Sequence, residues 1–448
     1  MKIRNYPALV SLVYLSSFSD SSSQSEPGRW TTLPNAPVVS RHNDAFFVNA
    51  DTGWIVNGNG QIYKTANGGA SWQLQFVRGM AHFRSVGFLN AIEGWAGNVG
   101  AGEFGATDTN VLYRTRNGGQ SWQAFSQFHG PAPAGICGMH VVNDSTICAA
   151  GRVRGPSFFI RTTDGGNTWT SKDMSEYAAG LIDVYFVHPD SGFAVGLTNV
   201  THDLSSGVVL FTSDGGQNWE KRFTTSRMGE WCWKISFPSR QTAYVSLQRN
   251  SLSPIYFLKT VDGGYTWQEK LFSNDYYFVQ GIGFVSDEIG WAGGNSSFPT
   301  YETTDGGETW RSAGFGTRVN RFRFLNDSLG YAVGQTVYKF SKAGTVSVQD
   351  RPDGPVWSYA LRQNYPNPFN PSTTFRFQLR ERIFVSLIVH DVNGRQVKEV
   401  LRRVCEAGEN TATWDGTDDR GKPVGSGTFV YTLEAGELLE ARKMVLVR

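Results

Sequence analysis

Short alternating runs of apolar and polar residues, separated by turn residues, extend along most of the chain. Residues 82–125 are representative, with the runs HFRSVGF at 82–88, GWAG at 94–97, VLYRT at 111–115 and SWQAF at 121–125. Alternation over four to eight residues is typical of β-strands. Few windows have a helical period, and this favours an all-β chain built from units of four strands.

One phrase recurs six times, at 65–72, 115–122, 162–169, 212–219, 260–267 and 303–310. Each copy contains an Asp or Asn, two glycines and a closing tryptophan, as in TTDGGNTW; we call these copies the boxes. Their Asp/Asn and Trp positions are Asn67, Trp72, Asn117, Trp122, Asp164, Trp169, Asp214, Trp219, Asp262, Trp267, Asp305 and Trp310. The tryptophans are 50, 47, 50, 48 and 43 residues apart. This is the period of a four-stranded propeller blade, and a catalytic constellation does not occur six times in one chain.

The composition of a box is typical of a tight hairpin between the third and fourth strands of a unit. Asp-Gly or Asn-Gly supplies the positive φ that the bend requires. The Asp or Asn oxygen can accept hydrogen bonds from turn N–H groups. We therefore expect the boxes to be structural, with each tryptophan filling the space between neighbouring sheets.

A second landmark gives seven units rather than six. An apolar residue followed seven positions later by an aromatic residue or cysteine occurs at Phe47/Trp54, Phe88/Trp95, Val141/Cys148, Phe186/Phe193, Phe237/Tyr244, Phe284/Trp291 and Phe324/Tyr331. The last unit ends without a box, whereas Trp30 stands alone at the start of the chain. The sequence predicts a seven-bladed β-propeller over residues 29–344, in which the strand at Trp30 closes the last blade near 337–340 and removes a free edge.

Composition and charge exclude several partners. The net charge of +2 gives no case for nucleic acid. The four cysteines show no zinc spacing, and we expect buried free thiols.

His42, His82 and His140 fall on or near the first strands of consecutive units. They could share a metal site, but ordinary hydrogen bonding is the favoured interpretation, so no metal and no cofactor is assigned.

The two ends of the chain differ from the repeats. Residues 1–24 carry a basic start, an apolar stretch and a Ser-rich tail, which is typical of a secretory signal peptide. No later segment is long and apolar enough for a transmembrane span, and we expect a monomer. After a linker at 345–358, residues 359–448 show seven short alternating runs divided by NG, DG and GSG turns, which predicts a small β-sandwich.

The connections between second and third strands are long and polar, and we expect them to share one face with the connections between blades. Repeat folds commonly bind partners where such insertions cluster. Basic and aromatic residues of the first strands are predicted to form a binding mouth on that face: Arg41, Arg84, Trp231, Lys234, Arg321 and Arg323.

The boxes resemble the Asp-box (bacterial neuraminidase repeat) family. Together with the GW-x-x-G phrases they are most similar to propellers of the photosystem II assembly/stability-factor type. That resemblance implies the fold rather than an activity. Sialidases also carry boxes, but this chain has no Arg-Ile-Pro motif, and the xyloglucan-cleaving enzymes use two propellers. The loop acids Glu103, Asp108, Asp183 and Asp203 leave a secreted glycoside hydrolase as the alternative to a binding or scaffold protein, and no catalytic residue is assigned.

The C-terminal phrases resemble the type A sorting domain of the type IX secretion system, an immunoglobulin-like module related to flagellar hook-capping proteins. The matching positions are Asn364, Tyr365, Pro366, Asn367, Pro368, Phe369, Asn370, Pro371, Asp391, Gly394, Arg395, Trp414, Asp415, Gly416 and Lys443. The resemblance implies a protein of the Bacteroidetes/Chlorobi neighbourhood, exported through the periplasm to the medium or outer cell surface. Its partners would be the secretion machinery and an extracellular glycan or surface protein.

Overall fold

The computed structural model describes residues 28–250, 252–294, 299–342, 360–379, 383–392, 394–406, 408–435 and 438–448. Apart from the short 3-10 turn η1 (His202–Leu204), every element in these ranges is a strand, so the all-β class is confirmed. Within the same ranges no helix has the length and apolarity to cross a membrane. The predicted signal peptide and linker lie outside the described residues.

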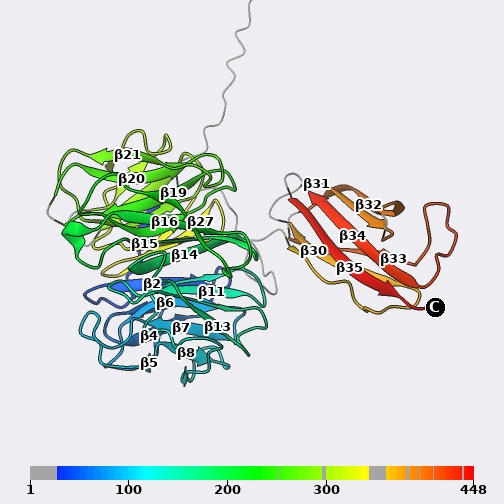
Figure 1. The fold of residues 1–448 in the computed structure, drawn as a ribbon, viewed down its shortest axis with the longest axis horizontal. Coiled ribbons are helices and arrows are strands. Elements are labelled where there is room, and N and C mark those ends of the chain that lie inside the picture. The colour runs from blue at the N-terminus through cyan, green and yellow to red at the C-terminus, as the bar shows by residue number, and fades with distance from the viewer. Residues whose placement is uncertain are drawn as a thin grey trace, which may run out of the picture.

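Residues from Arg29 to Ser341 form seven antiparallel four-stranded sheets (Figure 1). In order from the inner strand outward, the first three blades are β2 (His42–Phe47), β3 (Gly53–Asn57), β4 (Gln61–Thr65), β5 (Gln73–Val77); β6 (Phe83–Phe88), β7 (Gly94–Asn98), β8 (Leu112–Thr115), β9 (Gln123–Phe125); and β10 (Gly138–Val141), β11 (Ile147–Gly151), β12 (Phe158–Thr162), β13 (Thr170–Asp173). The next three are β14 (Gly180–His188), β15 (Ser191–Leu197), β16 (Gly207–Thr212), β17 (Glu220–Thr224); β18 (Trp231–Ser236), β19 (Ala243–Gln248), β20 (Ile255–Thr260), β21 (Gln268–Ser273); and β22 (Val279–Phe284), β23 (Gly290–Gly294), β24 (Tyr301–Thr303), β25 (Arg311–Ser312).

The seventh blade is closed by the N-terminal strand, as predicted. It consists of β26 (Arg321–Phe324), β27 (Leu329–Val333), β28 (Val337–Ser341) and β1 (Arg29–Thr32). Trp30 is paired with Phe340, and its ring stacks 5.0 Å from that of Phe315. A strand from the start of the described chain therefore occupies the outer position that β5 or β9 fills in other blades, and it covers the edge of β28.

The boxes form the predicted hairpin turns. In the third blade the Thr162 hydroxyl donates to Asp164 at 2.8 Å, the Gly166 N–H donates to Thr162 Oγ1 at 2.8 Å, and the Thr168 N–H donates to Asp164 at 3.0 Å. The same three bonds recur in the other five boxes. Gly165 and Gly166 have φ of 72° and 80°, a region that a glycine adopts without strain.

Each box also contacts the preceding blade. Arg161 donates to the Gly215 carbonyl at 2.9 Å, and Lys259 donates to the Gly306 carbonyl at 2.8 Å. The ring is closed in the same way, because Tyr331 and Lys339 of the seventh blade donate to the Gly68 carbonyl of the first at 3.2 and 3.3 Å. We call these bonds the latches.

The box tryptophans contribute apolar contacts at the same boundaries. The Trp219 ring lies 5.1 Å from that of Phe159 in the preceding blade and 6.3 Å from that of Phe186 in its own. The prediction that box tryptophans fill the space between sheets is therefore confirmed at this boundary.

The box turns and the turns between first and second strands lie together on what we call the box face. The N–H of the first box glycine donates to the neighbouring turn, as from Gly165 to the Ser145 carbonyl at 2.9 Å. The opposite face, which we call the loop face, carries the connections between second and third strands and between blades. There the Thr107 N–H donates to the Met80 carbonyl at 2.9 Å, which joins the two kinds of connection as predicted.

The C-terminal residues form a two-sheet sandwich with its own core. One sheet is β29 (Ala360–Leu361), β30 (Thr373–Leu379) and β33 (Gly408–Trp414). The other has the order β32 (Gln396–Cys405), β31 (Ile383–His390), β34 (Gly427–Ala435) and β35 (Leu438–Leu446). Phe375, Leu387, Trp414 and Tyr431 are buried between them. The four cysteines of the chain are buried and free, as expected.

Candidate functional site

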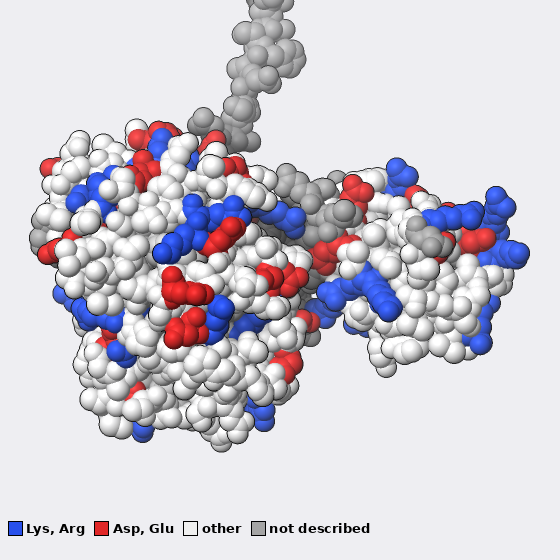
Figure 2. All heavy atoms as spheres, in the orientation of Figure 1, with Lys and Arg blue, Asp and Glu red and all other residues white. Residues whose placement is uncertain are grey.

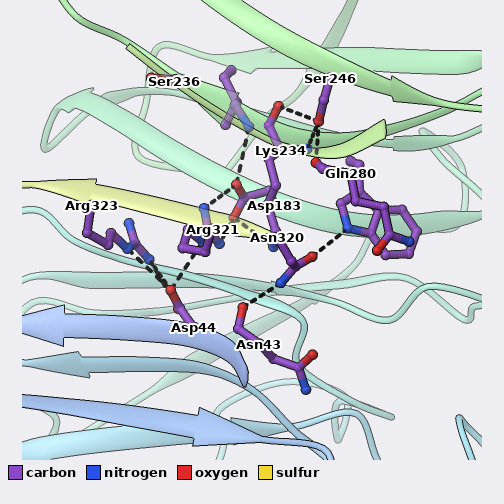
Figure 3. A network of polar contacts seen from close by, with 12 residues as sticks. Asn43, Asp44, Asp183, Lys234, Ser236, Ser246, Gln280, Asn320, Arg321 and Arg323 are labelled. Carbon is purple, nitrogen blue, oxygen red and sulfur yellow. Dashed lines mark hydrogen bonds and ion pairs between the residues drawn. The ribbon is translucent and has the colours of Figure 1, made fainter. Parts of the chain in front are cut away.

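The inner strands bring a set of charged side chains together at the propeller axis (Figure 3). Arg321 makes a bidentate contact with Asp183, with both distances 2.8 Å, and its Nε lies 3.1 Å from Asp44. Arg323 also donates to Asp44, at 3.0 and 3.1 Å. Lys234 Nζ lies 4.0 Å from Asp183. We call these five residues the channel cluster.

The channel cluster holds several blades together. Asp44 of the first blade accepts a hydrogen bond from the Val86 N–H of the second at 3.2 Å. Asp183 of the fourth accepts one from the Ile235 N–H of the fifth at 3.2 Å. Both carboxylates bind the seventh blade through Arg321. The two arginines and two aspartates are therefore occupied with one another, and their first role is to fix the centre of the ring.

Burial and neighbouring charge shift the titration of this cluster. Burial alone would raise the pKa of Asp183, but the charges of Arg321 and Lys234 outweigh it and hold that pKa below its ordinary value. Burial lowers the pKa of Lys234 to about 7, and the Arg321 charge adds to this effect. The cluster thus keeps its carboxylate charged and disfavours the charged form of its lysine.

Register shifts in the pairing of inner strands re-aim side chains toward the propeller axis. Five of the seven inner strands have a register shift at a corresponding place, next to Asn43, Arg84, Ile182, Lys234 and Gln280. A β-bulge of this kind re-aims a side chain and is common next to functional sites. The sequence interpretation missed these bulges; the only signal was a polar residue inside an otherwise apolar inner strand.

Above the channel cluster, Arg41 begins a chain of polar side chains. Arg41 donates to Asn43 at 3.2 Å and also to Gln280, which in turn donates to Gln248 at 2.7 Å. Burial lowers the pKa of Arg41 to about 9, and the nearby charge of Arg84 contributes. Arg41 and Arg84 are therefore close enough to repel one another.

Arg84 is the most unusual residue of the site. It is fully buried, with its guanidinium 5.1 Å from the centre of the Trp233 ring and 5.4 Å from that of Phe104. None of its three guanidinium nitrogens has a hydrogen-bond partner among the described residues. Burial lowers its pKa. A buried cation without an acceptor is unfavourable unless a partner arrives.

The structure places the six predicted mouth residues below the surface rather than on it. Arg84, Trp231, Lys234 and Arg321 are buried, whereas Arg41 and Arg323 are half-buried. All but Trp231 lie in the channel cluster or next to it. Trp231 lies beside His202, with ring centres 5.0 Å apart, under the loop face. A contact between these residues and a ligand stays a prediction.

The three channel histidines have separate hydrogen bonds. His42 contacts the Pro37 carbonyl at 2.9 Å, His82 contacts Asn43 at 3.1 Å, and His140 accepts from the Phe186 N–H at 3.1 Å. Burial lowers their pKa values to about 4, 3 and 3 respectively. Across the described part of the chain, no group of three or more potential ligands could hold a metal ion.

The acids considered for glycoside hydrolysis have internal or local partners. Asp108 accepts from Arg78 at 3.1 Å and also from Tyr113, and these bonds hold its pKa below the ordinary value although burial opposes them. Glu103 is buried 3.8 Å from Arg154, and Asp203 is exposed beside His202. A general acid needs a raised pKa. The pKa values of Asp108 and of the ion-paired Asp183 are instead held below their ordinary values.

The loop face carries a set of exposed apolar residues beside the buried basic centre. They extend over the second to fifth blades and are Met80, Phe104, Val200, Leu204, Met228 and Leu252. We call them the apolar arc. Neighbouring loops connect them: Arg154 lies 5.4 Å from the Phe104 ring, and a side chain at Gly155 would meet Val200. On the side in view in Figure 2, charges of both signs are interspersed over the propeller, without a single-sign patch.

In the sandwich, several motif positions have structural roles. The Asn364 side chain donates to the Pro366 carbonyl at 3.1 Å and to Thr373 at 2.9 Å. Trp414 is buried and donates to the Thr417 carbonyl at 2.8 Å. Asp391 accepts from the Arg395 N–H at 2.9 Å, which closes the turn that contains Gly394. The remaining motif positions lie along the same opening segment, along β35 and in the Asp415–Gly416 turn, and their part in sorting stays a prediction.

Comparison with known proteins agrees with both modules. The FlgD Ig-like domain model matches residues 368–437. The photosystem II assembly lipoprotein Ycf48 of Synechococcus sp. (strain CC9902) is 26% identical over 221 residues, which are 44% of this chain and 61% of that protein. The chain thus spans less than two thirds of that relative. The immunoglobulin-like character of the sandwich and the likeness of the repeats to photosystem II assembly propellers are supported.

Solved structures share the fold at low identity. YCF48 bound to D1 peptide has a TM-score of 0.52 and 16% identity, covering 71% of this chain and 97% of that one. PorZ, a surface component of the type IX secretion system of Porphyromonas gingivalis, has 0.52 and 12%, covering 92% and 60%. The GH74 xyloglucanase of Xanthomonas campestris has 0.50 and 11%, covering 79% and 60%. At these identities the likeness concerns the fold alone.

Proposed function

We propose that the chain is an exported scaffold protein whose loop face binds a protein partner outside the cell. The observation that carries this proposal is the apolar arc. Its members lie on connections that can vary without disturbing the blades, and exposed apolar patches commonly mark interaction sites.

The chemistry of the apolar arc favours a protein over a glycan. Sugar-binding faces use exposed aromatic rings as stacking platforms, whereas five of the six arc residues are Met, Val or Leu. Flexible aliphatic and thioether side chains suit the apolar side chains of a protein segment. The relative YCF48 has been solved with a bound D1 peptide, so a propeller of this type can receive a peptide.

The test combines Met228→Ser with Leu252→Ser on the loop face. Its control combines Val261→Ser with Tyr265→Ser, which are also exposed but lie on the box face. Both double variants should melt like the wild type, because surface substitutions change stability by about 0.5 kcal/mol or less. Fluorescent full-length chain is then added to cells of a type IX-competent bacterium, before and after protease treatment.

We expect binding to the cells to be lost in the loop-face variant, kept in the control and abolished by protease treatment of the cells. Binding to a glycan array by the wild type, removed by the same substitutions, would replace the protein partner with a glycan. Turnover of a panel of chromogenic glycosides, abolished by one Asp or Glu substitution on the loop face, would establish the glycosidase instead.

We further propose that residues 359–448 direct export by the type IX system to the medium or the outer cell surface. Support comes from the Asn-Pro-rich opening motif, the D-x-x-G-R and WDG turns and the independent core of the sandwich. In a type IX host, removing residues 355–448 should leave the protein in the periplasm. Fusing them to a reporter with a signal peptide should carry that reporter across the outer membrane. Equal export of the truncated and full chains would contradict the sorting role.

A further inference from the structure

The centre of the propeller has more buried cations than anions. The inner strands carry the buried Arg84, Lys234 and Arg321 and the half-buried Arg323, and the half-buried Arg41 directly precedes β2, whereas the two carboxylates beside them are Asp44 and Asp183. Arg321 and Arg323 are satisfied by the two aspartates. Arg84 and the Nζ of Lys234 have no hydrogen-bond partner within the described residues.

Arg84 and Lys234, the two cations without hydrogen-bond partners, lie in the same region of the propeller axis. The Arg84 charge acts on Arg41, on His82 and on Lys234, lowering the pKa of each after the effect of burial. Glu103, a buried loop carboxylate, lies 3.9 and 3.8 Å from Arg152 and Arg154, and its Oε1 accepts from the Arg154 N–H at 2.9 Å. Burial lowers the pKa of Arg84, and the charges of Glu103 and Asp183 offset this effect only in part. No described residue accepts a hydrogen bond from the Arg84 guanidinium, although Glu103 Oε2 is also without a hydrogen-bond partner.

An exposed aromatic ring of the loop face lies next to the buried Arg84. Phe104 lies over the guanidinium and 5.1 Å from the His82 ring, and it is itself exposed on the loop face. Its φ of 46° is unusual for a bulky residue, and it is followed by Gly105, which has open space around it. Strained backbone at a ligand-facing loop is a common feature of binding sites.

We propose that Arg84 binds a carboxylate of the partner, and that the Phe104 ring covers this site until the partner displaces it. The proposal rests on the proposed function in one respect, namely that the loop face receives the partner. A carboxylate fits because a guanidinium presents paired N–H donors in a planar fork. Trp233 would hold the opposite face of the guanidinium, and the apolar arc would contact the residues around the carboxylate.

The test measures anion binding by the full chain without needing the partner. Thermal unfolding is followed in sodium acetate across the millimolar range against sodium chloride of equal ionic strength. We expect acetate to raise the melting temperature in a saturable way, because a ligand of the folded state stabilises it. Arg84→Met should weaken acetate binding by about tenfold or more, because the donors of the fork are lost. Phe104→Ala should strengthen it.

The matched control is Arg114→Met. Arg114 lies 4.8 Å over the Trp95 ring, but outside the channel, so its loss removes a similar cation–π contact without touching the site. It should bind acetate like the wild type. If Arg84→Met does not fold, Arg84→Lys and Phe104→Ala keep the test open: the first should bind weakly and the second tightly.

Two peptides distinguish the source of the carboxylate. Acetyl-Ala-Ala-Leu with a free carboxyl end represents a chain terminus, and acetyl-Ala-Glu-Ala amide represents an acidic side chain. Equal effects of acetate on the wild type and Arg84→Met, or none on wild type and Phe104→Ala, would overturn the carboxylate site. That result leaves the proposed function intact if the Met228/Leu252 variant still loses cell binding. If neither the Met228/Leu252 variant nor Arg84→Met loses binding to the cells, the proposed function itself is overturned.

Discussion

The box face and the loop face of the same seven sheets differ in how their polar groups are satisfied. On the box face, one set of three hydrogen bonds is repeated in six turns, and latches join the third blade to the fourth, the fifth to the sixth and the seventh to the first. On the loop face, connections differ in length, apolar residues are exposed and Arg84 lacks an acceptor. The first arrangement is typical of a structural scaffold, and the second is typical of a binding surface. Stability and binding are therefore expected to separate between the two faces.

The largest loss of propeller stability is expected from deletion of residues 28–33, which contain β1. The deletion opens the seventh sheet and removes Trp30, which contacts Phe315, Trp291 and Phe340. We expect loss of the cooperative unfolding transition of the propeller by circular dichroism. Trp30→Ala alone should cost about 3 kcal/mol. Thr31→Ala on the same strand is the control, and a deletion that melts like the wild type would show that closure is dispensable.

Next in size should be Arg321→Met, which tests whether the channel cluster belongs to the scaffold. It leaves Lys234 as the remaining cation paired with Asp183 and removes one of the two arginines paired with Asp44. Breaking a buried ion pair by removing one side costs about 3–5 kcal/mol, measurable by urea unfolding. A variant as stable as the wild type would mean that the cluster contributes little and is free for a ligand.

The same cluster predicts an acid dependence. Because the folded-state pKa of Asp183 lies below its unfolded value of about 3.9, its contribution is complete above that pH and is lost as the pH falls. The difference in unfolding free energy between the wild type and Asp183→Asn should therefore shrink below about pH 4. A difference that does not change with pH would contradict the ion pair.

A smaller effect is expected from a single latch. Lys339→Met removes the bond to the Gly68 carbonyl while Tyr331 keeps its own. The loss should be about 1 kcal/mol, as for one hydrogen bond. The control is Lys270→Met, whose lysine pairs with exposed Glu308 and not with a box carbonyl. Its effect should stay within about 0.5 kcal/mol, and an equal loss in both would argue against a specific role for the latch.

The smallest effect should come from Asp305→Asn in the sixth box. Two natural boxes already use Asn67 and Asn117 with the same geometry, so stability at neutral pH should change by about 0.5 kcal/mol or less. Hydrogen bonds from Thr309 hold the pKa of Asp305 at about 2, so the wild type should lose more stability than the variant between about pH 4 and 2. Denaturant titrations at the two pH values measure this, and a parallel loss in both proteins would contradict it.

What the sequence determined by itself is local or periodic. The box turns follow from residues within eight positions of one another, because Asp/Asn oxygens and positive-φ glycines act on their own turn. The blade period and the missing seventh box follow from the recurrence of that phrase along the chain. The closing strand was predicted from the count of seven units and six boxes. The seventh unit lacks a box tryptophan, and Trp30 at the start of the repeats supplies one. The alternating runs of the C-terminal sandwich were local in the same sense.

Only the tertiary structure decided which charges meet at the axis. Arg321 is 138 residues from Asp183 along the chain, and Arg323 is 279 from Asp44. Seven inner strands place similar residues at similar heights, so strand pattern alone does not say which cation finds a carboxylate and which remains without one. The register shifts at Arg84 and Lys234 re-aim these two side chains, whereas Arg321 and Arg323 lie on a strand with regular pairing. The unpartnered state of Arg84 is for that reason a property of the closed ring and not of its strand.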